Sequence, residues 1–420
     1  MLSAEGTAGF SAPDFDTNGL RAFYDAHLYQ PAWLGSPAAQ ANANLVLTAL
    51  AHADEEGLRP DRYRLGEIDL RRKAESVQAA AEYELLLTDA LLRYARDLRQ
   101  GQAELRDVDQ DVGLPPDYFY PATDLDQALR ANRLSEFLAD LAPPHPEYQH
   151  LKVALARYRA IAAKNDSPAA EADVQRIIAN MERWRWVPRS FGSRYVDVNA
   201  ASASLEVVEN GKVVLTSPTV VGKPDARTPI FTAVASAFTV NPSWHIPTQI
   251  VRKEILPHAR ANPGYLARHH MVRTASGGYR QLPGHGNALG VIKMEMPNEF
   301  DAYLHDTPMH SLFAEDERHL SHGCVRVERI QPLISYAMTG DVDSGLDRIH
   351  SLIMTHGTRR ISLDDPLPVF VLYWTAIADA DGAVNFLPDV YGRDQRLISA
   401  MAEQHLSSRI TMNFGAPGRN

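Results

Sequence analysis

The sequence predicts an α+β protein with a helical N-terminal part and a β-rich C-terminal part. Apolar residues recur every three or four positions up to about residue 185, which is the period of an amphipathic helix. After Pro188 the period shortens to two, which is typical of strands with one buried face. We therefore expect a helical scaffold domain over 1–185, a β-rich domain over 186–395 and a C-terminal tail over 396–420.

The predicted helices rest on apolar spacing and on end signals. Apolar residues follow one another at spacings of four, three and four from Leu87 to Leu98, and Gly101 follows as a helix stop. A second helix carries the same kind of stripe between Tyr148 and Tyr158. Ser167-Pro168 then opens a third helix, with serine as the N-cap and proline in the first turn.

The β-rich part contains one strong hairpin signal and several further strands. Asn210-Gly211 separates two apolar runs, and both residues readily adopt the positive φ angles of a tight turn. Residues 231–240, 291–296 and 369–378 have the pattern of further strands, and a turn at 379–382 leads into 383–386. These elements indicate a sheet-based domain.

Residues 244–286 interrupt the strand pattern, with a helical stretch at Pro247–Leu256 and then glycine- and histidine-rich turns. Long inserts in a compact domain are usually functional. We therefore expect a capping insert, or lid, over 244–286, with a passive surface insertion as the alternative.

Composition narrows the function classes. With 45% apolar and 22% charged residues in 420 the chain has a globular balance, and its formal net charge is −10 without a Lys/Arg-rich block. Nucleic acid and anionic membranes are therefore not expected as main partners. The sequence has no run of eighteen apolar residues, so we expect no membrane span. Residues 1–7 lack the basic and apolar regions of a signal peptide. A single cysteine cannot form an internal disulfide, so it does not decide the compartment.

That single cysteine, Cys324, lies in the run Ser321–Arg326, and His305 lies nineteen residues upstream. A thiolate can attack a carbonyl carbon while an imidazole takes its proton, and backbone N–H groups at a glycine turn can hold the resulting oxyanion. The alternative is that a lone cysteine is a small buried hydrophobe. The surrounding residues favour a nucleophile.

Zinc is the rival chemistry, because several histidines lie near Cys324 in the sequence. However, the chain has no second cysteine, no HExxH and no C-x-x-C. We therefore expect neither a metal nor a cofactor. The histidines concerned are His305, His310, His319 and His322.

His305 together with Ser321–Arg326 resembles the signature of L,D-transpeptidases with the YkuD-type catalytic domain. Further segments resemble the large YcbB-type members in the same order along the chain, and the resemblance covers nearly all of it. These segments are 23–33, 87–94, 180–188, 221–225, 287–290 and 373–376. One departure is that the helix ending near Lys164 runs through Asn165-Asp166 into Ser167, which leaves no room for the peptidoglycan-binding module of the large relatives.

The resemblance implies a β-sandwich catalytic domain and a role for each motif residue. Cys324 would form a thioester, and His305 would be the base, oriented by the backbone carbonyl of Asp306. His322 competes for the base role, since it lies two positions from the thiol. The N–H groups of His322, Gly323 and Cys324 would form the oxyanion hole.

Residues flanking the motif are candidates for holding substrate. Arg326 would anchor a substrate carboxylate bidentately, and its alternative is an internal ion pair. The other candidates for substrate contact are Ser321, Tyr303, Asn287 and Trp244.

The resemblance implies an enzyme that cross-links peptidoglycan stem peptides in the periplasm and is acylated by carbapenems. We therefore expect a mature or engineered chain whose export signal has been removed. The default product is a 3-3 cross-link. A divergent proteobacterial branch instead makes 1-3 links from L-alanine to diaminopimelate, and His285 is a departure that keeps this open. The alternatives are an L,D-carboxypeptidase or endopeptidase with the same site, and a non-catalytic wall-binding scaffold.

Overall fold

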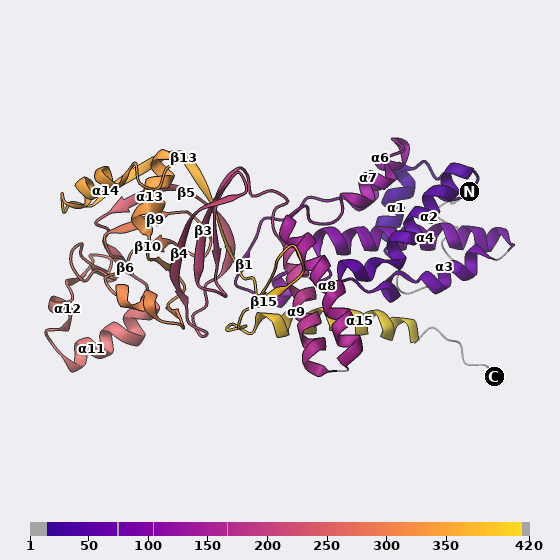
Figure 1. Cartoon of the computed structure of the whole chain (residues 1–420). Coiled ribbons are helices and arrows are strands. Elements are labelled where there is room, and N and C mark those ends of the chain that lie inside the picture. The colour runs from indigo at the N-terminus through magenta and orange to yellow at the C-terminus, as the bar shows by residue number, and fades with distance from the viewer. Residues whose placement is uncertain (1–14, 74, 104, 166, 414–420) are drawn as a thin grey trace. The chain divides into compact units, whose positions relative to one another are not determined.

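The computed structural model describes residues 15–73, 75–103, 105–165 and 167–413 (Figure 1). These residues form two compact units. The helical unit comprises the described residues of Met1–Gln110, Pro115–Ser190 and Thr375–Asn420, and the sheet unit comprises Asp111–Leu114 and Phe191–Trp374. The export-signal prediction depends on residues 1–7, which lie outside the described residues. The missing-module prediction depends in part on Asp166, which also lies outside them.

The helical unit is built around α4 (Val77–Gln100), whose predicted apolar stripe from Leu87 to Leu98 is buried as expected. Gly101 caps this helix with a φ of 98°, a value that a residue with a Cβ rarely adopts. Ser167 occupies the N-cap position of α9 without a side-chain capping bond. The helices are α1 (Thr17–Ala26), α2 (Pro37–Ala51), α3 (Leu65–Arg72), α4, α5 (Leu105–Val108), α6 (Pro121–Arg130), α7 (Leu134–Ala139), α8 (Pro146–Asn165), α9 (Pro168–Trp186) and α15 (Arg393–Asn413).

The C-terminal segment corrects two predictions. The strand expected over 369–378 is two strands in different units, β13 (Arg359–Leu372) and β14 (Ala376–Ala378), and β14 pairs with β15 (Val384–Phe386) as a hairpin. Residues 375–395 therefore belong with the helices and not with the predicted 186–395 domain. The expected tail over 396–420 begins inside α15, which starts at Arg393.

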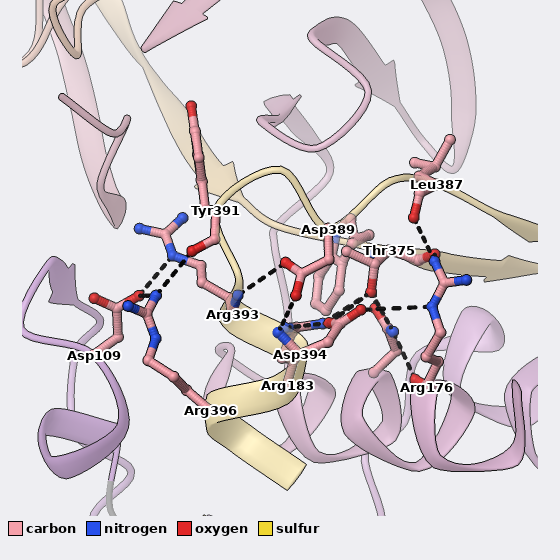
Figure 2. A network of polar contacts seen from close by, with 12 residues as sticks. Asp109, Arg176, Arg183, Thr375, Leu387, Asp389, Tyr391, Arg393, Asp394 and Arg396 are labelled. Carbon is pink, nitrogen blue, oxygen red and sulfur yellow. Dashed lines mark hydrogen bonds and ion pairs between the residues drawn. The ribbon is translucent and has the colours of Figure 1, made fainter. Parts of the chain in front are cut away.

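A buried polar network explains why the chain changes units at residue 375 (Figure 2). The Thr375 backbone N–H donates to the side-chain oxygen of Asn180 on α9 at 2.9 Å, and the Thr375 hydroxyl donates to Asp394 at 2.9 Å. Arg183 on α9 pairs with the same carboxylate of Asp394 at 2.6 Å, and Arg393 pairs with Asp109 at 2.6 Å. These bonds attach the C-terminal segment to the helices, because leaving such buried groups unpaired would be costly.

The sheet unit contains a ten-stranded sheet with the order β1-β5-β13-β2-β3-β4-β12-β10-β9, and β11 pairs with β4. Because β9 also pairs with β5, the pairing path closes on itself. The Asn210-Gly211 hairpin is confirmed, with φ angles of 50° and 74° between β3 and β4. The strands are β1 (Val112–Gly113), β2 (Arg194–Asn199), β3 (Ser204–Glu209), β4 (Lys212–Gly222), β5 (Ile230–Val240), β9 (Ile292–Glu295), β10 (Leu304–His305), β11 (His319–Ser321), β12 (Val325–Val327) and β13. Two helices, α13 (Ile330–Thr339) and α14 (Leu346–Ile353), lie between β12 and β13 in the sequence.

The insert at 244–286 has its own secondary structure and its own small core. A three-stranded sheet of order β6-β8-β7 packs with a helical segment that contains one π-helical turn, Val251–Ile255. The buried residues of this core are Ile246, Val251, Ile255 and Met271. Its elements are β6 (Trp244–Ile246), α10 (Thr248–Ile250), α11 (Leu256–Ala261), α12 (Tyr265–Arg268), β7 (Met271–Arg273) and β8 (Tyr279–Gln281). None of the described helices combines the length and apolar character needed to cross a membrane.

Candidate active site

Two short parallel strands bring four of the predicted site residues onto one face of the sheet. In the β10–β12 pair, Leu304 lies opposite Val325 and His305 lies opposite Arg326. The same register places Tyr303 beside Cys324, and the Val325 N–H donates to the Tyr303 carbonyl at 3.1 Å. Because side chains alternate between faces with a period of two, Tyr303, His305, Cys324 and Arg326 share one face. Leu304 and Val325 point into the core on the other face.

A third strand extends this arrangement with a residue that our sequence analysis missed. In the antiparallel β9–β10 pair, Lys293 lies opposite His305, so Lys293, His305 and Arg326 form one row across three strands. The Lys293 ammonium lies 3.9 Å from the centre of the Tyr303 ring. The signal was available, because Lys293 interrupts an apolar strand at the position that faces away from buried Ile292 and Met294.

The His305 imidazole is buried and has a fixed orientation. His305 is 5% exposed, and its Nδ1 bonds the backbone carbonyl oxygen of Asp306 at 2.5 Å. With Nδ1 donating, Nε2 has the lone pair that a general base needs. Burial, followed by the charges of Arg326 and Lys293, lowers the pKa of His305 to about 3, so the ring is neutral at physiological pH.

Asp306 holds this orientation through its side chain, as a structural group. One carboxylate oxygen accepts the Val291 N–H at 2.8 Å, and the Asp306 N–H donates to the Ile292 carbonyl at 2.9 Å. Gly290 must be glycine here: its φ is 59°, and a Cβ would lie 2.3 Å from the Asp306 carboxylate. These contacts place the carbonyl that orients His305.

The Cys324 thiol lies against Tyr303. Burial raises the pKa of the Cys324 thiol, while hydrogen bonds from the Tyr303 backbone and hydroxyl and the charges of Lys293 and Arg326 act in the opposite direction. Burial and the neighbouring thiol raise the pKa of Tyr303, so its hydroxyl stays protonated and can donate. The resting site therefore holds a neutral thiol near a neutral imidazole, and the proton must move as the sulfur attacks.

The turn before the nucleophile is closed by side-chain bonds, which changes two predicted roles. Gly323 has a φ of 112°, and its N–H donates to the Ser321 hydroxyl at 3.1 Å. The Ser321 hydroxyl donates in turn to the Cys324 carbonyl at 2.6 Å. The Gly323 N–H is thus engaged and is not free to bind an oxyanion in this conformation. Ser321, which is buried, shapes the turn and does not present a group to substrate.

Thr228 fixes the same turn from the neighbouring loop. Its hydroxyl accepts the Gly222 N–H at 2.8 Å and donates to the Gly323 carbonyl at 2.9 Å. Thr228 is completely buried, so these bonds are shielded from water. The sequence carried no signal for this residue, because the contact joins positions 95 residues apart.

His322 has its hydrogen-bond partner in the insert. Its Nε2 lies 2.6 Å from the Glu254 carboxylate in the π-helical turn of the insert, and its side chain is partly exposed. The insert makes a second contact through Trp244, a neighbour of Tyr303 that acts to lower the pKa of the Tyr303 hydroxyl. Through these two contacts the 244–286 segment reaches the residues around Cys324.

Two further candidates for substrate contact have opposite outcomes. Asn287 is 2% exposed and uses its whole amide internally: Nδ2 donates to the carbonyls of Pro242 and Leu282, and Oδ1 accepts the Leu289 N–H. It fastens the base of the insert, which corrects its predicted substrate role. Arg326, in contrast, has no ion pair among the residues that the structure describes, and its buried Nε lacks a hydrogen-bond partner. This disfavours the alternative of an internal ion pair.

The four histidines near Cys324 point to separate partners. His310 faces the Asp306 carboxylate at 3.6 Å, and His319 bonds the Ala200 carbonyl at 3.0 Å, while His305 and His322 have the partners given above. Within the described ranges, no group of three or more His, Cys, Asp or Glu side chains is placed to hold one metal ion.

Comparison with known families agrees with this architecture. Residues 18–155 match a scaffold domain, and residues 193–349 match the L,D-transpeptidase catalytic domain, YkuD. The chain therefore carries an L,D-transpeptidase catalytic domain that follows a helical scaffold domain in sequence, and the predicted fold class is confirmed. A Haemophilus influenzae protein named "Putative L,D-transpeptidase" is 29% identical over 344 residues, which are 76% of this chain and 68% of that protein.

Solved structures of L,D-transpeptidases match part of this chain. An L,D-transpeptidase from Mycobacterium smegmatis is 16% identical, with 43% of this chain and 58% of that chain covered and a TM-score of 0.24. L,D-transpeptidase 3 from Mycobacterium tuberculosis, in complex with a faropenem-derived adduct, is 13% identical, with 43% and 60% covered and a TM-score of 0.23. The chain thus spans about six tenths of the length of these structures.

Proposed function

We propose that this chain is a peptidoglycan L,D-transpeptidase that works through a thioester on Cys324. The observation that carries the proposal is the β10–β12 register, which gathers Tyr303, His305, Cys324 and Arg326 on one face of an L,D-transpeptidase catalytic domain. A non-catalytic wall-binding scaffold would not need a thiol, an oriented neutral imidazole and an unpaired guanidinium in one place.

In the acylation step, the Cys324 sulfur attacks the carbonyl carbon of an L-configured residue in the donor stem peptide. His305 Nε2 takes the thiol proton as the S–C bond forms, and the backbone N–H groups of His322 and Cys324 are the remaining candidates for holding the oxyanion. The C–N bond to the following D-residue then breaks, and His305 returns the proton to the departing amine. The thioester remains on Cys324.

In the transfer step, the side-chain amine of diaminopimelate on a neighbouring stem attacks the thioester. His305 accepts a proton from this amine, the C–S bond breaks, and the thiol is restored. Acylation at the third-position diaminopimelate gives a 3-3 cross-link, our default, and acylation at the first-position L-alanine gives a 1-3 cross-link. The same steps with water as acceptor make the enzyme an L,D-carboxypeptidase or endopeptidase.

The insert is proposed as a lid that favours amine over water. It approaches the site through Trp244 near Tyr303 and through Glu254 on His322. A lid that excludes bulk water protects a thioester from hydrolysis. We further infer a periplasmic location, where peptidoglycan is accessible, and acylation of Cys324 by carbapenems.

Purified protein incubated with muropeptides tests the proposal by mass spectrometry. Dimers support transfer, shortened monomers indicate hydrolysis, and no change in any muropeptide would reject the enzymatic function. Fragmentation of the dimers distinguishes a diaminopimelate-to-diaminopimelate bond from an L-alanine-to-diaminopimelate bond. Cys324→Ala is the matched control: it should form neither product nor carbapenem adduct while keeping its circular dichroism spectrum. Full turnover by this variant would refute the thioester route.

A further inference from the structure

Two cations stand on either side of the His305 imidazole. Lys293 on β9 and Arg326 on β12 are the cross-strand neighbours of His305 in its own row, one from each adjacent strand. Cross-strand neighbours have Cβ atoms about 5 Å apart, so both charges are close to the ring. The thiol of Cys324 occupies the next row of the same face, beside Tyr303.

Neither cation has an ion-pair partner in the part of the chain that the structure describes. Among the residues described by the structure, no carboxylate lies within ion-pair distance of Lys293 or Arg326, and the buried Nε of Arg326 has no acceptor. The acidic residue nearest in sequence on β9, Glu295, is engaged with Thr239 at 2.5 Å and Arg360 at 2.7 Å. Lys293 instead lies over the Tyr303 ring.

Two uncompensated cations beside a buried imidazole are unfavourable unless an anion binds there, because like charges repel strongly where water is scarce. We propose that Lys293 and Arg326 together form a carboxylate-binding site that selects donor peptides by the free carboxylate next to the scissile bond. This inference rests on the proposed function and adds to it a specificity residue, Lys293, and the ligand class. The Arg326 fork and the Lys293 ammonium are both suited to a carboxylate.

The position of this site gives the bound carboxylate a second effect. During acylation His305 must hold a proton. The groups that face it are Lys293 from β9, Arg326 from β12, and Tyr303 and Cys324, which directly precede β10 and β12. The two cations disfavour the protonated ring. A carboxylate that binds both of them offsets their charge, so the base becomes competent when a donor with a free carboxylate is in place.

Alkylation of the single cysteine tests the site without relying on transpeptidation. Iodoacetate and iodoacetamide react with a thiolate by the same displacement, in which an S–C bond forms and iodide leaves, but only iodoacetate carries a carboxylate. The rate ratio of iodoacetate to iodoacetamide therefore reports on a carboxylate site beside Cys324. It would be measured by intact mass for wild type, Lys293→Met, Lys293→Arg, Arg326→Met and the control Lys212→Met. Lys212 is an exposed lysine in the β3–β4 hairpin, so its replacement removes the same charge far from the thiol in sequence.

We expect the ratio to fall about tenfold in Lys293→Met and in Arg326→Met, to stay near wild type in Lys293→Arg, and not to change in Lys212→Met. With peptide donors, Lys293→Met should raise KM for a free-carboxylate donor and leave the C-terminal amide of the same donor unaffected. Equal ratios in Lys293→Met and Lys212→Met, or equal slowing of both reagents, would overturn the proposal. Failure of the transpeptidase function is distinguishable, because it would remove muropeptide products while the alkylation ratios keep this order.

Discussion

Replacing Thr228 by valine removes one hydroxyl and keeps the shape of the side chain, which makes it a direct test of how the nucleophile is positioned. The hydroxyl bridges the Gly222 N–H and the Gly323 carbonyl with bonds of 2.8 and 2.9 Å at a fully buried position. Leaving a buried donor or acceptor unpaired costs about 1–3 kcal/mol. Loss of both partners should therefore lower the free energy of unfolding by about 2–4 kcal/mol.

Thr228→Ser is the matched control, because it keeps the hydroxyl and deletes only a methyl group, at about 1 kcal/mol. Urea unfolding would measure the stability of both variants, and the rate of carbapenem acylation, followed by intact mass, would report on Cys324. We expect Thr228→Val to be less stable than Thr228→Ser and to acylate at least about tenfold more slowly, because the turn that carries the nucleophile loses its anchor. If the two variants match in stability and acylation rate, the bridge does not position Cys324.

Three further outcomes are expected. His305→Ala should lower kcat on muropeptides by roughly 10²–10⁴ and His322→Ala by less, and the reverse order would give the base role to His322. Burial lowers the pKa of His305 to about 3, below the unfolded value near 6.5, so the unfolded state binds more protons in this window and stability falls as the pH falls. At pH 5 the loss amounts to about 2 kcal/mol, so His305→Gln should lose less stability than wild type between pH 7.5 and 5 in urea unfolding, and equal losses would contradict a buried neutral ring. Shortening the 244–286 insert should preserve carbapenem acylation and shift products from dimers to hydrolysed monomers, and an unchanged product ratio and KM would make the insert a passive surface feature.

The local sequence was sufficient for several of the elements and for proposing the reactive residues. The apolar stripe of α4, the Asn210-Gly211 turn and the break in strand pattern at residue 244 all depend on spacing within a few residues, and each is present in the structure. The surroundings of Cys324 likewise follow from one short run and one upstream histidine. Such patterns are readable because backbone period and turn chemistry are local properties.

Contacts between distant segments decided the rest. Strand register, which no short window contains, placed Lys293 in one row with His305 and Arg326. Long-range bonds gave Thr228 to the nucleophile turn, withdrew Asn287 from substrate, and moved Thr375 and the following hairpin into the helical unit. Each of these assignments depends on satisfying buried polar groups across the fold, and the partner of a buried group is set by tertiary packing and not by neighbours in the sequence.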